Sequence, residues 1–264
     1  MISMGPDRYR ATVGKSAEGK MRNNTNGTWS KCEVGQSCVG PLIPAPVFSS
    51  VLEIGGDYWL AGSNSMVRCA NGAGNCVAVK DGISGQTWGE GTLVGTVGTD
   101  IWYSALDRVL HFDGASWTMT PNLHARTIFQ VSKSDIWIAD NQFQHWDGAA
   151  WSAPMGISGA AAPGFVSYLG GSAKDDVWAV GDGGSAAFAA HWDGTKWSLV
   201  PMPQGAAEVR GLFAPSRSEV FVLTSTMLYR WTGTWAAIAM PPSVDGGAGE
   251  PNWDVLAGPA KKRP

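Results

Sequence analysis

The sequence predicts an all-β protein made of repeated four-stranded antiparallel units, and three observations point to that class. Short apolar runs alternate with turns that contain Gly, Asp or Asn, which is typical of strands and hairpins. Residues 175–200 show the pattern most fully, because the run Asp-Val-Trp-Ala-Val-Gly leads through a small-residue loop to His-Trp-Asp-Gly-Thr-Lys-Trp, with Asp-Gly as a hairpin signal. Similar units recur at roughly forty-residue intervals, a period that indicates a β-propeller.

Composition narrows the class further. The chain has 264 residues, of which 44% are hydrophobic and 16% charged, so a single folded domain over 1–264 is expected. The net charge of −3 gives no reason to expect nucleic acid or an anionic membrane as a partner. No apolar run approaches the roughly 20 residues of a spanning helix, so membrane insertion is not expected. The first residues lack the apolar core of a signal peptide, so either the protein is not exported or this is a mature or trimmed form.

An aromatic residue two positions after an acidic one marks the second strand of each unit. These anchors are Tyr9, Trp59, Trp102, Trp137, Trp178 and Phe221. An apolar first strand is expected before each of the last five anchors, at 50–54, 93–97, 127–131, 165–169 and 209–213.

A second landmark follows each anchor and predicts a hairpin between the third and fourth strands. It reads His-Phe-Asp-Gly-Ala-Ser-Trp at 111–117 and His-Trp-Asp-Gly-Ala-Ala-Trp at 145–151, with related copies at 191–197 and 230–235. The turn needs a positive φ, which Gly supplies, and the two aromatic residues of each copy are expected to face each other across the strands.

The unit at 48–80 has cysteines where the other units have aromatic residues. Cys69 and Cys76 occupy the two facing positions, and facing residues of an antiparallel pair lie about 4.5–5.5 Å apart, within reach of a disulfide. A Cys69–Cys76 disulfide is therefore expected, with free buried thiols as the alternative. A second local disulfide, Cys32–Cys38, is less constrained geometrically. If both bonds form, the compartment is oxidising.

The two ends of the chain complement each other. The unit anchored on Tyr9 lacks a first strand, and residues 252–258 form a strand-like run with no anchor after it. We expect this run to enter the N-terminal sheet as its innermost strand and to close a ring of six blades, which removes an exposed edge. The blades are approximately 1–35 plus 252–258, 48–80, 92–120, 126–155, 165–201 and 208–240. The alternative is a fragment of a longer propeller.

The run Asp-Val-Trp-Ala-Val-Gly followed by His-Trp-Asp-Gly-x-x-Trp resembles repeats that are common in exported bacterial β-propellers, loosely similar to kelch- and tectonin-type proteins. The resemblance covers nearly the whole chain except the longer connectors. It implies a propeller fold and an extracellular, periplasmic or cell-surface location. Those proteins share no single reaction, so the resemblance implies no catalytic residue.

The strand order predicts where a ligand would bind. Successive strands of a blade alternate in direction, so the loops after second strands and the connectors between blades share one face, opposite the Asp-Gly turns. These connectors are long, and loops on a rigid scaffold concentrate binding groups. A tryptophan there can stack on a sugar or a peptide, although packing is its more frequent role. The ligand-binding residues expected on this face are Trp88, Trp253, Asp107, His124, Arg126, Asp182 and Arg210.

The polar residues of the repeat are expected to be structural. His111, His145 and His191 take equivalent positions in successive blades, so they splay around the ring, whereas a metal needs its ligands around one point. The Asp of each Asp-Gly turn is expected to cap that turn. We expect no metal and no cofactor, and the chain carries none of the common hydrolase or phosphate-binding motifs.

The sequence therefore favours a non-catalytic recognition module that binds a glycan or a protein on its long-loop face. A structural or assembly component of a cell-surface complex is the main alternative. A glycoside hydrolase-like enzyme with its site at the channel mouth is less favoured, because the Asp box of six-bladed sialidases has a different spacing and their arginine cluster is missing.

Overall fold

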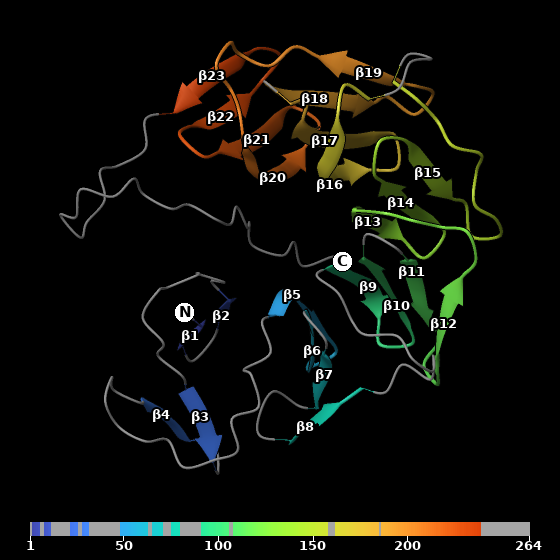
Figure 1. The fold of residues 1–264 in the computed structure, drawn as a ribbon, viewed down its shortest axis with the longest axis vertical. Coiled ribbons are helices and arrows are strands. Elements are labelled where there is room, and N and C mark those ends of the chain that lie inside the picture. The colour runs from blue at the N-terminus through green and yellow to red at the C-terminus, as the bar shows by residue number, and fades with distance from the viewer. Residues whose placement is uncertain are drawn as a thin grey trace. The chain divides into compact units, whose positions relative to one another are not determined.

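The computed structural model describes residues 2–5, 8–11, 22–25, 28–31, 48–62, 65–70, 75–79, 91–105, 108–157, 162–184 and 186–238, with the backbone alone for the strands before residue 48. Every regular element in this part of the chain is a β-strand (Figure 1). Accordingly, it contains no helix long and apolar enough to cross a membrane. The chain divides into two compact units, Met1–Leu123 and His124–Pro264.

The first unit contains two hairpins and two four-stranded antiparallel sheets. The hairpins are β1 (Ile2–Gly5) with β2 (Arg8–Ala11), and β3 (Arg22–Thr25) with β4 (Thr28–Lys31). The sheets are β5 (Phe48–Ile54), β6 (Asp57–Gly62), β7 (Ser65–Ala70) and β8 (Asn75–Ala78), then β9 (Gly91–Val97), β10 (Asp100–Ala105), β11 (Arg108–Phe112) and β12 (Trp117–Thr120). The first strands β5 and β9 lie against each other, and the Leu93 amide donates to Ser50 Oγ at 2.9 Å.

The second unit contains three antiparallel sheets whose first strands adjoin one another, β13 against β16 and β16 against β20 (Figure 1). They are β13 (Thr127–Ser132), β14 (Asp135–Ala139) and β15 (Phe143–Trp146); β16 (Phe165–Ala173), β17 (Asp176–Asp182), β18 (Ala187–Trp192) and β19 (Trp197–Val200); β20 (Val209–Ser216), β21 (Glu219–Thr224), β22 (Leu228–Trp231) and β23 (Trp235–Ile238). The five first strands expected from the sequence are present as β5, β9, β13, β16 and β20.

One sheet departs from the repeat at its outer edge. The β13–β15 sheet has three regular strands, and its fourth is reduced to two isolated bridges, Trp146 with Trp151 and Phe143 with Met155. Pro154 lies between the bridges and has no N–H to donate to a ladder. The Ser152 hydroxyl instead accepts from the His145 amide at 3.0 Å, so a side chain replaces part of the missing ladder.

Within each unit, anchor tryptophans contribute to the core by packing onto the next sheet along the chain. In the first unit Trp59 contacts Phe112 and Trp117, with ring centroids 5.2 and 6.1 Å apart. In the second unit Trp137 meets Trp192 and Trp197 in the same way, at 4.8 and 5.3 Å. Each such ring removes a large apolar surface from water, which is the main stabilisation available to a stack of sheets.

The predicted hairpins between third and fourth strands are confirmed. Phe112 faces Trp117, Trp192 faces Trp197 and Trp231 faces Trp235. In the described turns glycine takes the positive-φ position, for example Gly194 at 97°. In the β5–β8 sheet Cys69 faces Cys76, and the predicted disulfide joins them with an S–S distance of 2.03 Å.

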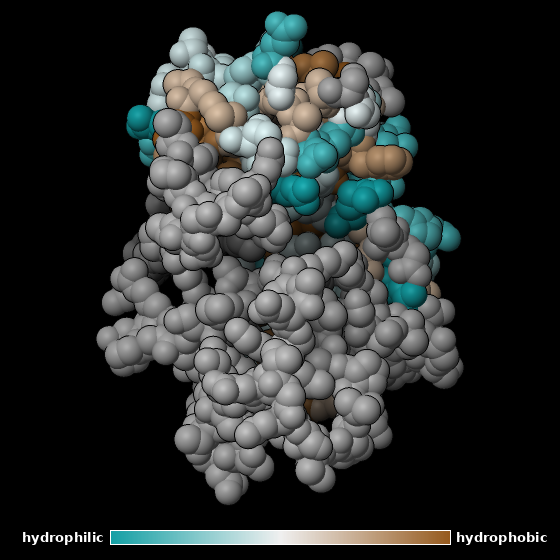
Figure 2. All heavy atoms as spheres, turned by 60° about the vertical axis from the view of Figure 1, so that its left-hand side comes forward, coloured by the Kyte–Doolittle hydropathy of each residue, from teal (hydrophilic) through white to brown (hydrophobic). Residues whose placement is uncertain are grey.

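Large apolar side chains that remain exposed are scattered singly over the described residues. They are Val51, Val77, Val97, Met119, Phe165 and Leu199. Figure 2 draws one face, on which hydrophilic and apolar side chains of the described residues are interspersed without a broad apolar patch. Isolated exposed apolar residues are normal for a folded protein, so a candidate site has to be found from contacts rather than from hydropathy.

Two sequence predictions lie outside the described residues. The proposed closing strand at 252–258 is one, and the Cys32–Cys38 disulfide is the other. The number of blades and the closure of the ring therefore stay predictions.

Candidate functional site

Each sheet has two ends with different chemistry. The turn end carries the tight turns that join strand 1 to strand 2 and strand 3 to strand 4. The loop end is the opposite one, where the first strand begins and the second strand ends. At the turn end the two turns of a sheet touch, because a Cβ placed on Gly194 would lie 2.8 Å from the Asp175 Cβ.

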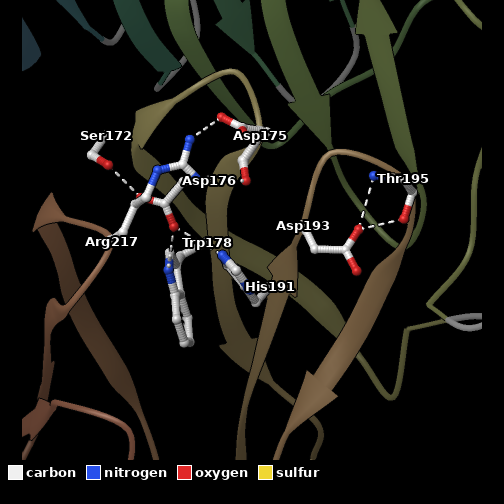
Figure 3. Close-up of polar contacts among 8 residues, drawn as sticks. All are labelled: Ser172, Asp175, Asp176, Trp178, His191, Asp193, Thr195 and Arg217. Atoms are coloured by element: carbon white, nitrogen blue, oxygen red, sulfur yellow. Dashed lines mark hydrogen bonds and ion pairs between the residues drawn. The ribbon is translucent and has the colours of Figure 1, made fainter.

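The carboxylates of the Asp-Gly turns cap those turns, as the sequence predicted. Asp193 Oδ1 accepts hydrogen bonds from the Thr195 amide at 2.8 Å and the Thr195 hydroxyl at 2.6 Å (Figure 3). It also accepts from the Lys196 amide at 3.0 Å. These bonds, the hydroxyl bond first, lower the pKa of Asp193 from 3.8 to about 2. Asp113 and Asp147 accept two amide bonds each, and those bonds lower their pKa values too.

The acid of the Asp-x-Trp pattern also lies at the turn end and holds a histidine of the third strand. Asp176 accepts from Ser172, lies 2.9 Å from His191 Nε2 and lies 3.3 Å from the indole nitrogen of Trp178 (Figure 3). Burial raises the pKa of Asp176, but the hydrogen bonds from His191 and Ser172 outweigh the burial, so the pKa lies below its ordinary value. The His191 ring packs on Trp178 at 4.6 Å between centroids.

This arrangement of an acid, an aromatic ring and a histidine or arginine recurs in each sheet from β5 to β23. His111 and His145 each lie 2.8 Å from an Asp and stack on the anchor tryptophan of the same sheet. Arginine replaces histidine twice, since Arg68 pairs with Asp57 and Arg230 pairs with Glu219. Sequence reasoning assigned structural roles to the histidines but missed their acidic partners and the two arginines. The signal was present, because each anchor from Trp59 to Phe221 has an acid two residues before it and a histidine or arginine on the third strand.

No group of His, Cys, Asp or Glu in the described residues could hold a metal ion. Each of the three repeat histidines is hydrogen-bonded to an Asp of its own sheet, which is the structural role expected for it. The turn end is thus occupied by contacts among its own residues.

The loop end of the second unit is different, and Arg126 is its most informative residue. Its guanidinium lies over the ring of Phe165, with Cζ 4.6 Å from the ring centroid. Its Nε is 3.5 Å from Asp140 Oδ1, which is a long contact. Phe165 begins β16 and is 52% exposed, so the ring is open to solvent beside the arginine. The structure therefore joins a guanidinium, a carboxylate and an exposed aromatic ring from adjoining sheets.

The next part of the loop end contains Asp182, Glu208 and Arg210. Asp182 Oδ1 accepts from the Val209 amide at 3.0 Å and so joins the end of β17 to the start of β20. Arg210 Nη2 donates to Glu208 Oε2 at 3.1 Å in an exposed pair. Glu208 has a φ of 52°, in the left-handed region that a non-glycine residue rarely adopts.

Four of the predicted binding residues are thus described, and all lie in the second unit. Arg126, Asp182 and Arg210 lie at the loop end in the contacts above, and the exposed His124 lies two residues before Arg126. Asp140, Phe165 and Glu208 were missed, because only the meeting of adjoining sheets shows that they belong with the others. Trp88, Asp107 and Trp253 lie outside the described residues.

The loop end can bind but shows no reactive arrangement among its described contacts. It offers guanidinium donors, carboxylate acceptors and one aromatic face, and these groups suit a polar peptide or a similar ligand held by hydrogen bonds and packing. The ion pairs Arg126–Asp140 and Arg210–Glu208 are solvent-exposed. Exposed ion pairs contribute little to stability.

No protein-family model and no curated protein sequence matches the chain. Among solved structures it is similar to YCF48 bound to a D1 peptide, with 14% identity, a TM-score of 0.56, and coverage of 80% of this chain and 71% of that one. It is similar to the extracellular domain of BT4673 from B. thetaiotaomicron, with 12% identity, a TM-score of 0.59, and coverage of 74% and 31%. It is also similar to the WD40 β-propeller domain of Doa1, with 12% identity, a TM-score of 0.56, and coverage of 73% and 68%.

At such low identities the likeness shows the fold alone. Antiparallel four-stranded sheets, first strands that adjoin one another and similarity to known propellers agree with one architecture. The chain is an all-β protein with the architecture of β-propellers.

Proposed function

We propose that this protein is a non-catalytic binding module that holds a segment of a partner protein at the loop end of its sheets. One observation carries the proposal. At the turn end the carboxylates and cations bind one another, whereas at the loop end of the second unit Arg126 and Phe165 present a guanidinium and an exposed ring. Side chains that the scaffold does not need are the ones available to a ligand.

A rigid scaffold supports the same proposal. Pairs of an acid with a histidine or arginine join strand 2 to strand 3 in the sheets from β5 to β23, and within each unit anchor tryptophans pack on the following sheet. Binding to a preorganised surface orders few scaffold residues, which lowers the entropic cost of association.

A peptide is the ligand class that we favour. The similarity to a structure of YCF48 with a D1 peptide supports a protein ligand. The glycan alternative depended on stacking by Trp88 and Trp253, both outside the described residues, and no described contact favours a sugar.

We also propose that the protein works outside the cytoplasm and that six blades close into a ring through 252–258. The Cys69–Cys76 disulfide supports an oxidising compartment. The repeat pattern supports the closing strand. Deleting 252–258 from the full chain is expected to lower the midpoint of thermal unfolding by several degrees, and an unchanged midpoint would argue against closure.

The binding surface can be located by hydrogen exchange. A random peptide library displayed on phage is selected against the full chain, and amide exchange is compared with and without the best synthetic peptide. We expect protection at 124–127, 140–143 and 206–210 and unchanged exchange at 193–196. Protection centred on the turn-end residues 193–196, or failure to select any peptide, would refute the proposed function.

A further inference from the structure

We propose that Arg126, supported by Phe165, receives a carboxylate of the bound peptide, and that an apolar side chain next to this carboxylate covers the Phe165 ring. This inference rests on the proposed function and names the chemistry of its ligand. It concerns only the second unit, whose loop end brings the two residues together.

Three other arginines of the chain are each held by an acidic residue. Arg68 uses Nε and Nη2 on Asp57, at 2.9 and 2.5 Å, and Arg230 uses Nε and Nη2 on Glu219, at 2.7 and 2.6 Å. Arg217 uses both terminal nitrogens on Asp175. These three guanidinium groups each engage a partner through two nitrogens, which is the arrangement of a structural arginine.

Arg126 does not have such a partner. Its side chain has one polar contact, from Nε to Asp140 at 3.5 Å, and Nη1 and Nη2 make no hydrogen bond with the described residues. The side chain is 37% exposed, so part of it is open to a ligand. The two terminal N–H groups of a guanidinium match the two oxygens of a carboxylate.

The contacts of the Arg126 guanidinium restrict its position. The Phe165 ring supports one face of it at 4.6 Å, and Asp140 lies beside Nε, which is not part of the terminal edge. A guanidinium that already contacts a ring and a carboxylate loses less freedom when it forms two parallel hydrogen bonds. The exposed Asp140 contact is long, so a competing carboxylate can displace it at small cost.

The groups around Arg126 favour a carboxylate with an apolar neighbour. Phe165 is 52% exposed, and an apolar ligand side chain that covered it would remove apolar surface from water. Among the other charged groups described at this end, Glu208 accepts from Arg210 Nη2 at 3.1 Å and Asp182 accepts from the Val209 amide. Arg210 thus has a carboxylate at ordinary hydrogen-bond distance, whereas the described carboxylate contact of Arg126 is 3.5 Å long.

The test uses a fluorescein-labelled peptide selected on the full chain, together with matched synthetic variants. Its C-terminus is made as the free acid or as the amide, and each internal Asp or Glu is replaced by Asn or Gln, so that the source of the carboxylate is identified. We expect one of these changes to weaken binding about tenfold or more, by fluorescence anisotropy. The substitution Arg126→Gln is expected to cause a similar loss of affinity for the original peptide. It is also expected to abolish the difference in affinity between that peptide and the variant that lacks the recognised carboxylate.

Controls separate recognition from folding. Arg217→Gln removes a cation from the turn end of the same unit and should leave peptide affinity unchanged. Arg126→Lys keeps the charge but not the paired donors and should bind between wild type and Arg126→Gln. Arg126→Glu should regain affinity for a peptide whose carboxylate is replaced by Lys, a result that a merely misfolded variant would not give.

The two proposals can fail separately. If Arg126→Gln binds every peptide as the wild type does while exchange still shows protection at the loop end, the carboxylate inference is wrong and the proposed function stands. If the peptide protects the turn end instead, both are wrong.

Discussion

The two ends of the sheets in the second unit are built from similar side chains but differ in how those side chains are used. At the turn end Asp193 accepts three hydrogen bonds and Asp175 is held by two nitrogens of Arg217. At the loop end Arg126 has one long contact, and Glu208 takes a strained backbone conformation. Charged residues at the turn end thus bind one another, whereas at the loop end Arg126 has only a long contact with Asp140.

We infer that contacts repeated from sheet to sheet support the fold, whereas residues that differ between sheets are candidates for binding. The turn-end contacts recur from sheet to sheet because every sheet must solve the same packing problem. The residues of the loop end differ in each sheet, since no shared packing requirement fixes them. The following experiments test whether stability and recognition divide between the two ends in this way.

The largest effect is expected from the aromatic residues. Trp178 is 2% exposed and packs on His191 and on Trp231 and Trp235 of the next sheet, so Trp178→Ala should lower the free energy of unfolding by about 3–5 kcal/mol. Phe165→Ala at the loop end should cost less than about 1 kcal/mol, because that ring is half exposed. Urea denaturation of both variants measures the two losses in the free energy of unfolding. Equal losses would mean that the loop-end ring is also part of the scaffold.

The next effect separates two turn glycines. Gly194 and Gly233 have φ values of 97° and 99°, so alanine is strained at both, at about 1 kcal/mol. Gly194→Ala also brings a Cβ within 2.8 Å of the Asp175 Cβ, whereas nothing lies within 4 Å of a Cβ at position 233. We expect Gly194→Ala to lower the free energy of unfolding by about 2 kcal/mol and Gly233→Ala to lower it by about half as much. Thermal unfolding of both variants measures the two losses. The reverse order would contradict the contact between the two turns.

A change at the loop end should have the opposite sign. Glu208→Gly removes the strain of a left-handed φ of 52° and should stabilise the fold by up to about 1 kcal/mol. The lost pair with Arg210 is exposed and costs little. Glu208→Ala, which loses the carboxylate but keeps the strain, is the matched control. Destabilisation by Glu208→Gly, measured by the midpoint of urea unfolding, would show that the carboxylate belongs to the scaffold.

The smallest effect is the pH dependence at the turn end, because the Asp193 carboxylate is fully exposed and screened. Its pKa in the fold, about 2, lies below the ordinary 3.8, so the unfolded chain binds the proton more readily. The stabilisation is therefore present above pH 3.8 and is lost as the pH falls toward 2. The difference in melting temperature between wild type and Asp193→Asn should shrink over that interval. A difference that stays constant over the interval would contradict the capping role.

Much of the fold could be predicted because its signals are local. An Asp-Gly pair between alternating strands specifies a hairpin, and the facing positions of Trp192 and Trp197, or of Cys69 and Cys76, follow from the turn by counting along two antiparallel strands. The irregular fourth strand near Pro154 was not predicted, although its cause is also local.

The sequence by itself determined the strands, the turns, the facing aromatic pairs and the Cys69–Cys76 disulfide, because each depends on residues only a few positions apart. Tertiary structure decided which side chains from different sheets meet. The contact of Arg126 with Phe165 and that of Trp178 with Trp231 join residues far apart in the chain, and no periodicity fixes such distances. Packing between sheets therefore decides which polar and aromatic residues from different sheets lie together.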